Sequence, residues 1–575
     1  MWFNSKQSSW LLLFWVSIAA NRVTSSPSSS NRCRSIPSDE NWPSTSQWHA
    51  LNNTVGGRLI ATVPIAAPCH NFFRGAPTYN KERCATLRNT WFLPETHLLS
   101  SSSPMAYSSS NDTCNPWLAP NTSCSIGYHV AYAINVNNVS DIQAGLRFAK
   151  QHNIRLVIRN TGHDYLGRST GAHALALWTH NLKTIQTITY NGASYNGVAL
   201  KLGAGVRAID AYTFASSHGL QVVGGNCPTV GLAGGYSQGG GHGPMASKHG
   251  LGADQVLEVE IITADGKLLV ANSVMNSDLF WAVRGGGGGT FGIVVSMTVK
   301  AFPDTYASTG FITINDTGTN TDRIYEFLGS FLTGTVPGLV DAGVYALFSL
   351  TPLGFAMTPA FAPGMHQAEL DLLIQPAIDA MQSLNLEYEY SSAEAASFLA
   401  AYQSLPAQWN VSDYNTGGRL VSRDVVLSQT DALVQAIRDI GSRTIITGVC
   451  FNVSKSVPSP DAVAVNPYFR GSLFNLFFGL PINYTNDAAN RETLDDITTE
   501  LMPPLAAALP NGGAYLNEAD VQQPDFQSVF YGAHYPKLLN IKKRYDPDSL
   551  FYVKTGVGSD VWEEQLNGRL CRTQR

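Results

Sequence analysis

The segment Asn160-Thr161-Gly162-His163-Asp164-Tyr165-Leu166-Gly167, in which glycines flank a histidine, decides the fold of this chain. Residues 154–159 before it are mostly apolar and β-branched, which predicts a buried strand. Upstream, Ser140 and Gln143 have the spacing of a capping box, so a helix is expected to begin there. The apolar face of that helix is expected to contain Ile142, Leu146 and Ala149. The pattern therefore predicts a helix, a buried strand and a glycine-rich turn, in that order.

Two further glycine-rich segments follow, at residues 224–243 and 285–289. Like residues 160–167, they offer backbone N–H groups with no side chains in the way. Such loops can enclose a pyrophosphate whose charge is met by amide dipoles. None contains the Gly-Lys-Ser/Thr of a P-loop, and none has the strand–turn–helix context of a Rossmann fingerprint. One such loop is often only a turn, but three in order indicate a common binding site.

Two reactive side chains lie inside these loops, and each has two interpretations. His163 is either a hydrogen-bonded turn histidine or a point of cofactor attachment. Cys227 lies in Gly224-Gly225-Asn226-Cys227-Pro228-Thr229 and is either a buried free thiol or a second covalent attachment point. The residues alone leave both alternatives open.

The composition is that of a globular protein with a substantial core. The chain has 575 residues, of which 44% are hydrophobic, so two domains or one large composite unit are expected. Only 14% are charged, and 37 basic against 42 acidic residues give a formal net charge of −5. No surface for nucleic acid or anionic lipid is therefore expected, and a fibrous protein or coiled coil is excluded.

Residues 1–20 resemble an export signal. Lys6 supplies a weak positive region, residues 10–20 form an apolar stretch, and Ala19-Ala20 could satisfy a signal peptidase. The stretch is too short to span a bilayer, and no later run of about 20 apolar residues exists, so no stable membrane insertion is expected. The alternative is a buried N-terminal helix.

Glycosylation acceptors and cysteines support a secretory route. The Asn-x-Ser/Thr acceptors are Asn52, Asn111, Asn121, Asn138, Asn315, Asn410, Asn452 and Asn483. In an oxidising compartment disulfides are the default for cysteines, and Cys69–Cys84 and Cys114–Cys124 are close enough to close local loops. Cys33–Cys571 would tie the two termini together, although this pairing is a guess. We expect a secreted or luminal glycoprotein.

Shifts in glycine content divide the chain. Residues 126–303 are dense in glycine-rich loops and predict a cofactor domain, on which an N-terminal extension at 21–125 is expected to pack through its disulfides. Between 304 and about 505 these loops largely vanish, which predicts a second domain inserted into the first. Residues 506–575 regain Gly, Tyr and Asp-Pro punctuation and are expected to return to the cofactor domain.

Alternation and turn signals locate several elements. Strands are expected at 256–263 and 267–270 around an Asp265-Gly266 turn, and at 293–302. In the inserted segment, the expected elements are a strand at 343–350 and helices at 367–384 and 428–439.

Several motifs together resemble a known family. They are Arg159-Asn160-Thr161-Gly162-His163-Asp164, Gly225-Asn226-Cys227-Pro228-Thr229-Val230-Gly231, Asp278-Leu279-Phe280-Trp281-Ala282-Val283-Arg284-Gly285-Gly286-Gly287-Gly288-Gly289-Thr290-Phe291-Gly292, and Phe530-Tyr531-Gly532 with Lys543-Arg544-Tyr545-Asp546-Pro547. In these motifs the chain resembles the FAD-linked oxidoreductases of the vanillyl-alcohol oxidase superfamily, in the berberine-bridge-enzyme-like branch. It is most similar to a secreted fungal group with isoamyl-alcohol-oxidase-like proteins and biosynthetic-cluster oxidases.

The resemblance implies an α+β fold with a PCMH-type FAD-binding domain of two α/β subdomains and a substrate domain with a helix-covered antiparallel sheet. The active site should lie between the domains, with that sheet over the flavin. By position, His163 matches the histidine linked to the flavin 8α-methyl, and Cys227 the cysteine linked to C6. The implied FAD-binding residues are His163, Cys227, Asn160, Thr161, Gly162, Asp164, Tyr165, Gly167, Thr229, Val230, Gly231, Gly235, Gly240, Gly241, Gly292, Ile293 and Asn517.

The chain departs from the family in two places. Cysteines that usually lie around Ser35 and Asn41 are both absent, which fits the loss of one disulfide as a pair. The segment Tyr515-Leu516-Asn517-Glu518 resembles a Tyr-x-Asn-Tyr motif whose last tyrosine often serves as base, but here that position is Glu518. In an apolar pocket a carboxylate can have its pKa raised toward neutrality and act as base. Alternatively Glu518 pairs with a cation and only shapes the wall, and Tyr515 or Tyr165 is the base.

The resemblance implies an oxidase that passes hydride from an alcohol or hydroxylated metabolite to FAD and then reduces O2 to H2O2. The alternatives are a flavin dehydrogenase with another acceptor and a non-enzymatic flavin-bearing protein. Val230 matches a position that flanks the oxygen pocket, where valine accompanies oxidases and leucine slow oxygen reaction. A small-molecule substrate, a monomer and no metal site are expected.

Overall fold

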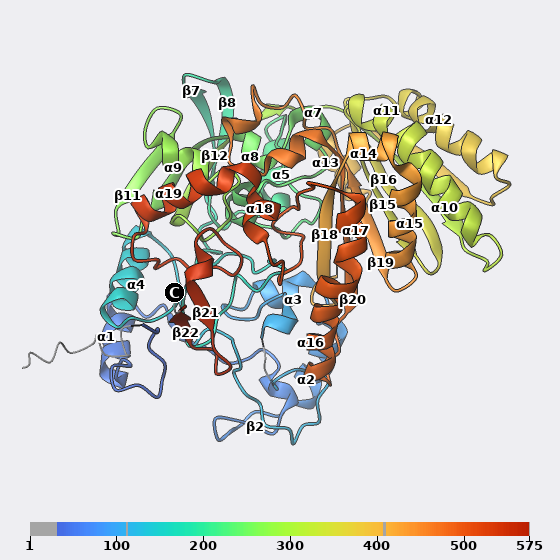
Figure 1. Ribbon diagram of the computed structural model, residues 1–575. Coiled ribbons are helices and arrows are strands. Elements are labelled where there is room, and N and C mark those ends of the chain that lie inside the picture. The colour runs from blue at the N-terminus through green and yellow to red at the C-terminus, as the bar shows by residue number, and fades with distance from the viewer. Residues whose placement is uncertain (1–31, 111–112, 406–409, 574–575) are drawn as a thin grey trace, which may run out of the picture.

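The computed structural model describes residues 32–110, 113–405 and 410–573 (Figure 1). The expected export signal at residues 1–20 and the acceptor Asn111 lie outside the described residues. Within the described part of the chain, the strands form three main sheets and several short pairs. The expected α+β class is confirmed. Among the helices described, none has the length and apolar character needed to cross a membrane.

The first sheet carries the loop that contains His163. Its order is β1-β4-β6-β5, with β4, β6 and β5 parallel and β1 antiparallel at the edge. The strands are β1 Leu59–Ala61, β4 Tyr132–Asn135, β5 Leu156–Arg159 and β6 Leu175–Trp178. Helix α4 (Val139–Gln151) packs on this sheet through the expected apolar face, which is fully buried.

The expected capping box of α4 is wrong. The helix begins at Val139, and the side chain of Asn138 accepts a hydrogen bond from the N–H of Asp141 at 3.1 Å. Asn138 has the extended backbone that an N-cap requires, whereas Ser140 is already inside the first turn and donates its hydroxyl to Asn138 Oδ1. Gln143 instead donates to the carbonyl of Gly266.

The second sheet is antiparallel and has the order β11-β10-β12-β8-β7. The expected hairpin is confirmed, and the expected strand at 293–302 ends early at Lys300. The strands are β7 Ile185–Asn191, β8 Asn196–Gly203, β10 Val256–Ile262, β11 Leu268–Asn272 and β12 Ile293–Lys300. The helices of this region are α5 Ala208–Ser216, α6 Ser237–Gly239, α7 Ala246–His249, α8 Gly252–Gln255 and α9 Ser277–Ala282, and β9 Leu220–Gln221 pairs with β13 Phe302–Pro303.

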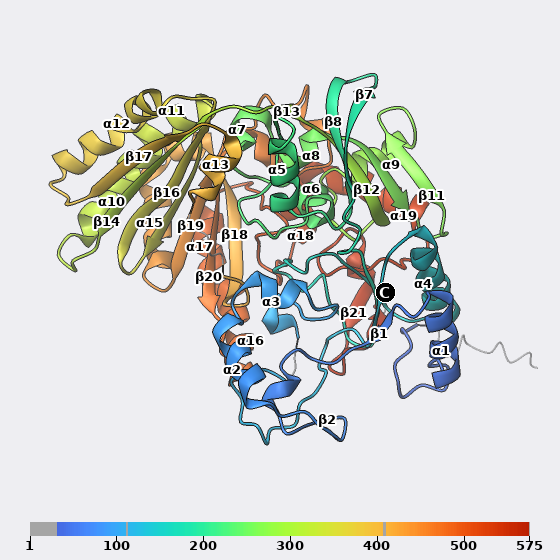
Figure 2. The ribbon, with the colours of Figure 1, turned by 180° about the vertical axis from the view of Figure 1, so that it is seen from behind.

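The third sheet is also antiparallel, with the order β17-β14-β16-β15-β19-β20-β18. The strands are β14 Ala307–Asn315, β15 Tyr345–Thr351, β16 Gly354–Pro363, β17 Glu389–Ala395, β18 Tyr414–Ser422, β19 Ile445–Cys450 and β20 Ser472–Pro481. The expected strand at 343–350 is β15. Helices cover one face of the sheet and bury an apolar core against it (Figures 1 and 2).

The helices of this region are α10 Thr321–Ser330, α11 Val336–Asp341, α12 Gln367–Ser383, α13 Phe398–Gln403, α14 Arg423–Ser428, α15 Thr430–Gly441, α16 Asp487–Asp496 and α17 Met502–Ala508. The helix expected at 367–384 is α12. The one expected at 428–439 is wrong in its start, because Gln429 has φ −137° and separates α14 from α15.

The N-terminal extension contacts residues at the ends of both the first and the third sheet. Carbonyls of His97, Ser100 and Ser103 accept hydrogen bonds from the buried guanidinium of Arg159, directly before the His163 loop. On the other side, the indole N–H of Trp91 donates to the hydroxyl of Tyr484, beyond the end of β20, at 2.8 Å. Figure 1 shows the same bridge, with α2 beside α16. The elements are α1 Thr45–Thr54, β2 Phe72–Phe73, β3 Ala76–Pro77, α2 Lys81–Thr90 and α3 Pro94–Leu98.

The disulfides agree with the sequence expectations. Cys69–Cys84 and Cys114–Cys124 close loops in the extension, and Cys33–Cys571 ties its start to the C-terminal strand pair. At the two positions where the resemblance implies a lost disulfide, Asn41 Nδ2 donates to Ser35 Oγ at 2.8 Å, so a hydrogen bond joins them. The C-terminal elements are α18 Phe526–Tyr531, α19 Tyr535–Tyr545, β21 Trp562–Glu564 and β22 Leu570–Arg572.

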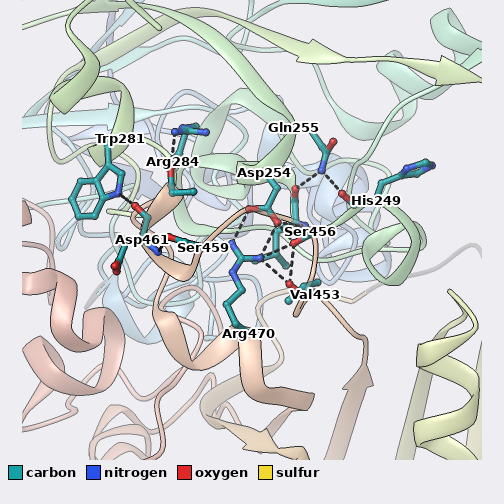
Figure 3. Close-up of polar contacts among 12 residues, drawn as sticks. His249, Asp254, Gln255, Trp281, Arg284, Val453, Ser456, Ser459, Asp461 and Arg470 are labelled. Carbon is teal, nitrogen blue, oxygen red and sulfur yellow. Dashed lines mark hydrogen bonds and ion pairs between the residues drawn. The ribbon is translucent and has the colours of Figure 1, made fainter. Parts of the chain in front are cut away.

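The loop between β19 and β20 holds the third sheet against the glycine-rich half (Figure 3). Arg470 forms two hydrogen bonds of 2.8 and 2.9 Å with Asp254 of α8, and the two side chains are 7% and 0% exposed. Ser456 Oγ donates to the same carboxylate at 2.7 Å. Nearby, Trp281 Nε1 donates to the carbonyl of Asp461 at 2.7 Å. These contacts join residues about 200 positions apart into one buried polar clamp.

Candidate functional site

A cavity of about 1570 Å³, its open mouth included, lies between the glycine-rich loops and the third sheet. Most of the residues that the sequence selected for FAD line it: Asn160, Thr161, Gly162, His163, Asp164, Tyr165, Cys227, Val230, Gly231, Gly235, Gly292 and Asn517. Five others are not among the residues that line it: Gly167, Thr229, Gly240, Gly241 and Ile293. Glu518 and Tyr515 also line the cavity.

Close backbone packing explains why glycines form one wall. Gly162 has φ +88°, and a Cβ added there would lie 2.6 Å from a guanidinium nitrogen of Arg159. Gly285 has φ +124°, and its Cβ would lie 2.1 Å from the backbone nitrogen of Val465. A side chain at either position would clash in a conformation that favours glycine. These two positions therefore require glycine, because the chain passes close to its neighbours there.

Arg168 ties the His163 loop to the C-terminal segment. Its guanidinium donates to the carbonyls of Leu516 and Lys554 and to the hydroxyl of Thr555, each at 3.0 Å. Among the described residues that line the cavity, Arg168 is the only lysine or arginine. A bound anion would thus rely mainly on backbone dipoles, as the sequence predicts.

His163 and Cys227 come from different loops and meet at the same wall. Cys227 Sγ lies 3.9 Å from His163 Nε2, and both contact the hydroxyl of Thr229, at 3.3 and 2.6 Å. Burial, with His97 and Arg159 nearby, lowers the pKa of His163 to about 3, so its ring is neutral at physiological pH. Burial also raises the pKa of the Cys227 thiol.

The opposite wall belongs to the third sheet. Leu347 of β15 pairs with Val449 of β19, which in turn pairs with Asn475 of β20. Phe477 follows Asn475 on the same face, because side chains alternate along a strand. Leu347, Val449 and Phe477 present an apolar surface to the cavity, while the amide of Asn475 donates to Glu518.

Glu518 is held by two partners from distant segments. His242 Nε2 lies 3.0 Å from one carboxylate oxygen and 3.1 Å from the other, and Asn475 Nδ2 donates at 2.7 Å. The side chains of His242 and Glu518 are only 9% and 17% exposed. The carboxylate, which lines the cavity, is therefore held in one orientation by hydrogen bonds.

A chain of hydrogen bonds extends from Asn226 through Tyr345 to His242. Asn226 Nδ2 donates to the hydroxyl oxygen of Tyr345, whose O–H can then donate to His242 Nδ1 at 3.4 Å. His242 would in this arrangement carry its proton on Nε2 and donate it to Glu518. The sequence analysis missed His242, Tyr345 and Asn475. Of these only His242 had a local signal, as the histidine of Gly240-Gly241-His242-Gly243.

The two tyrosines considered as bases are less suited to that role. Burial, and then the nearby Glu518, raise the pKa of both Tyr165 and Tyr515 above the ordinary tyrosine value. Both phenols therefore stay protonated at physiological pH. Asn517 donates to the hydroxyl of Tyr515 and to the carbonyl of Gly235, each at 2.9 Å, so it links the C-terminal segment to the glycine wall.

The cavity fits a large polar group. Three buried polar atoms of lining residues have no hydrogen-bond partner among the described residues: Asn160 Oδ1, Asn226 Oδ1 and the Tyr236 hydroxyl. Buried polar atoms are normally paired, so these atoms call for a ligand or solvent. Gly235 has open space where a Cβ would be. The residues present therefore fit a flavin dinucleotide along the glycine wall.

Comparisons with known proteins support an FAD site in this chain. The family model described as an FAD binding domain matches residues 130–272, and the one described as berberine and berberine like matches residues 514–558. An FAD-linked oxidoreductase of Hypocrea jecorina is 43% identical over 549 residues, 95% of this chain and 94% of that protein.

The chain belongs to the FAD-linked oxidoreductases of the vanillyl-alcohol oxidase type, with a berberine-like C-terminal segment. A vanillyl-alcohol-oxidase-type flavoprotein oxidase of Thermothelomyces thermophilus is 38% identical over 577 residues, 98% of this chain and 99% of that protein. A solved flavoprotein of this type from Myceliophthora thermophila C1 has a TM-score of 0.90 at 36% identity, over 94% of this chain and all of that one. The resemblance inferred from the motifs is confirmed, and the chain is an FAD-dependent oxidoreductase.

Proposed function

We propose that this protein is an oxidase that removes hydride from the carbon of an alcohol or hydroxylated metabolite and passes the electrons through covalently bound FAD to O2. The observation that carries the proposal is the position of Glu518, a hydrogen-bonded carboxylate in the cavity that His163 and Cys227 also line. FAD, when bound, supplies the hydride acceptor.

Glu518 would accept the hydroxyl proton of the substrate. His242 and Asn475 hold its two oxygens, so the carboxylate needs little reorganisation to take up the proton. Tyr515 and Tyr165 border the same space as neutral phenols and would orient the substrate. The apolar surface of Leu347, Val449 and Phe477 would exclude water from the substrate carbon.

Covalent attachment through His163 and Cys227 fits their positions. Both side chains line the cavity at one wall, 3.9 Å apart, and Cys227 is a free thiol whereas six other cysteines form disulfides. A cofactor that cannot leave would tolerate the open mouth of this cavity.

The disulfides support a secreted or luminal protein, and we propose a monomer.

Val230 supports O2 as the electron acceptor, because the resemblance associates a valine at this position with oxidases. Its side chain lines the cavity next to Gly231. A dehydrogenase remains the second candidate, since the reductive half of the reaction would be the same.

Anaerobic mixing with a panel of alcohols, followed by exposure to air, tests the function. An oxidase should bleach with a substrate and recover its colour in air with stoichiometric H2O2. Bleaching without rapid recovery would identify a dehydrogenase, and the absence of bleaching across the panel would contradict the proposed chemistry.

A further inference from the structure

The hydroxyl of Thr229 lies between the two candidate attachment side chains. Its Oγ1 is closer to His163 Nε2 and to Cys227 Sγ than these two atoms are to each other. Thr229 is 2% exposed and does not line the cavity, so it contacts both residues from the protein side. A hydroxyl has one proton, so Thr229 can donate a hydrogen bond to only one of the two side chains at a time.

One polarity leaves Nδ1 of His163 with its lone pair and also gives Cys227 Sγ a hydrogen-bond donor. If His163 donates Nε2–H to Thr229 and Thr229 donates its O–H to Cys227 Sγ, then His163 Nδ1 and the sulfur are both free to attack. In the reverse polarity Nδ1 carries the proton, and the thiol donates to Thr229. A neutral His163 ring has only one N–H, so the two arrangements exclude each other. The side-chain hydrogen bond from Thr229 is also the largest contribution that opposes the burial-driven rise in the pKa of Cys227.

We propose that Thr229 is a positioning residue for flavin attachment: it holds Nε2 of His163 so that the bond forms through Nδ1, and it orients Cys227 Sγ with its hydroxyl proton. This inference rests on the proposed covalent FAD. Thr229 thereby couples two attachments that come from separate loops.

The chemistry balances with O2 as the oxidant. His163 forms an N–C bond to the 8α carbon with loss of one proton from that carbon and one from the imidazole. Cys227 forms an S–C bond to C6 with loss of one proton from C6 and one from the thiol. In each attachment an electron pair passes through the flavin to O2, which takes up the two protons and leaves as H2O2.

The linkage isomer in the wild-type protein is the first test. Peptide mass spectrometry and NMR of the flavinyl peptide should show His163 linked through Nδ1. Linkage through Nε2 would overturn the proposal, because Nε2 could not then be held by Thr229. A wild-type protein that releases all its FAD on denaturation would instead contradict the covalent attachment itself, which is a separate result.

Substitution at Thr229 is the second test. Thr229→Val keeps the shape but removes the hydroxyl, so the fraction of His163 and Cys227 linked to flavin should fall about tenfold, as expected for a lost hydrogen bond to a reactive group. Thr229→Ser should restore attachment. The matched control is Thr444→Val, which removes a buried hydroxyl that, among the described residues, donates to the carbonyl of Gly479, and its flavin attachment should equal that of wild type.

Folding is checked by the thermal midpoint and by non-covalent FAD absorbance. If Thr229→Val is unfolded, Thr229→Ala replaces it in the same assay. Equal attachment through Nδ1 in a folded variant without the hydroxyl would overturn the positioning role.

Discussion

The two walls of the cavity are built by opposite means. The glycine wall is made of backbone. Its shape depends on positions such as Gly285, where a Cβ would overlap the backbone of Val465. The opposite wall, here called the sheet wall, consists of side chains of the third sheet. The strand register places Leu347, Val449 and Phe477 in one row there. The first wall can therefore be recognised from a short motif, whereas the second cannot.

The largest expected effect concerns the glycine wall and its two attachment residues. His163→Ala should leave the flavin held by Cys227, and Cys227→Ala should leave it held by His163. The double variant should release all flavin on acid precipitation, so the pellet becomes colourless. A coloured pellet from the double variant would show that another residue attaches the cofactor.

The clamp that joins the walls should have the next largest effect. Arg470→Met leaves the carboxylate of Asp254 buried without its partner, so the free energy of unfolding should fall by about 3–5 kcal/mol. The control is Arg438→Met, which breaks a pair whose partner Asp322 is 85% exposed, and a change of at most about 1 kcal/mol is expected there. Denaturant unfolding measures both. Equal losses in the two variants would mean that the buried clamp does not hold the halves together.

Glu518, to which Asn475 of the third sheet donates a hydrogen bond, tests whether this side of the cavity takes part in the proposed chemistry. Glu518→Gln keeps the shape but removes the proton acceptor, so anaerobic flavin reduction should slow by about 10²-fold or more. Stopped-flow absorbance measures this rate, and substrate binding should change little. Unchanged reduction across the pH range would move the role of base to another residue of the cavity.

The smallest expected effect concerns oxygen. Val230→Leu adds one methylene to a close-packed wall, and this should slow reoxidation by O2 several-fold while leaving anaerobic reduction almost unchanged. The measurement is the recovery of oxidised flavin absorbance after mixing the reduced protein with aerated buffer. Equal recovery in both proteins would mean that Val230 is ordinary packing.

Local patterns allowed much of the fold to be predicted. The α4 face, the β10–β11 hairpin, β15 and α12 follow from periodicity and turn residues within short windows. The errors were also local: the cap of α4 lies at Asn138, and Gln429 interrupts the helix expected at 428–439. In both places the non-helical backbone of one residue, Asn138 or Gln429, sets where the helix begins, although the apolar pattern of the helix was predicted correctly.

The sequence by itself determined the glycine loops and the positions of His163, Cys227 and Glu518, because a backbone that must pass within van der Waals distance of a neighbour requires glycine at fixed spacing. Only the tertiary structure decided which side chains surround Glu518. His242 lies 276 residues from it, in the loop between α6 and α7, and Asn475 lies 43 residues from it, where the register of β20 places it. The contact from Asn475 leaves no local trace, since any residue on that face of the strand could supply it.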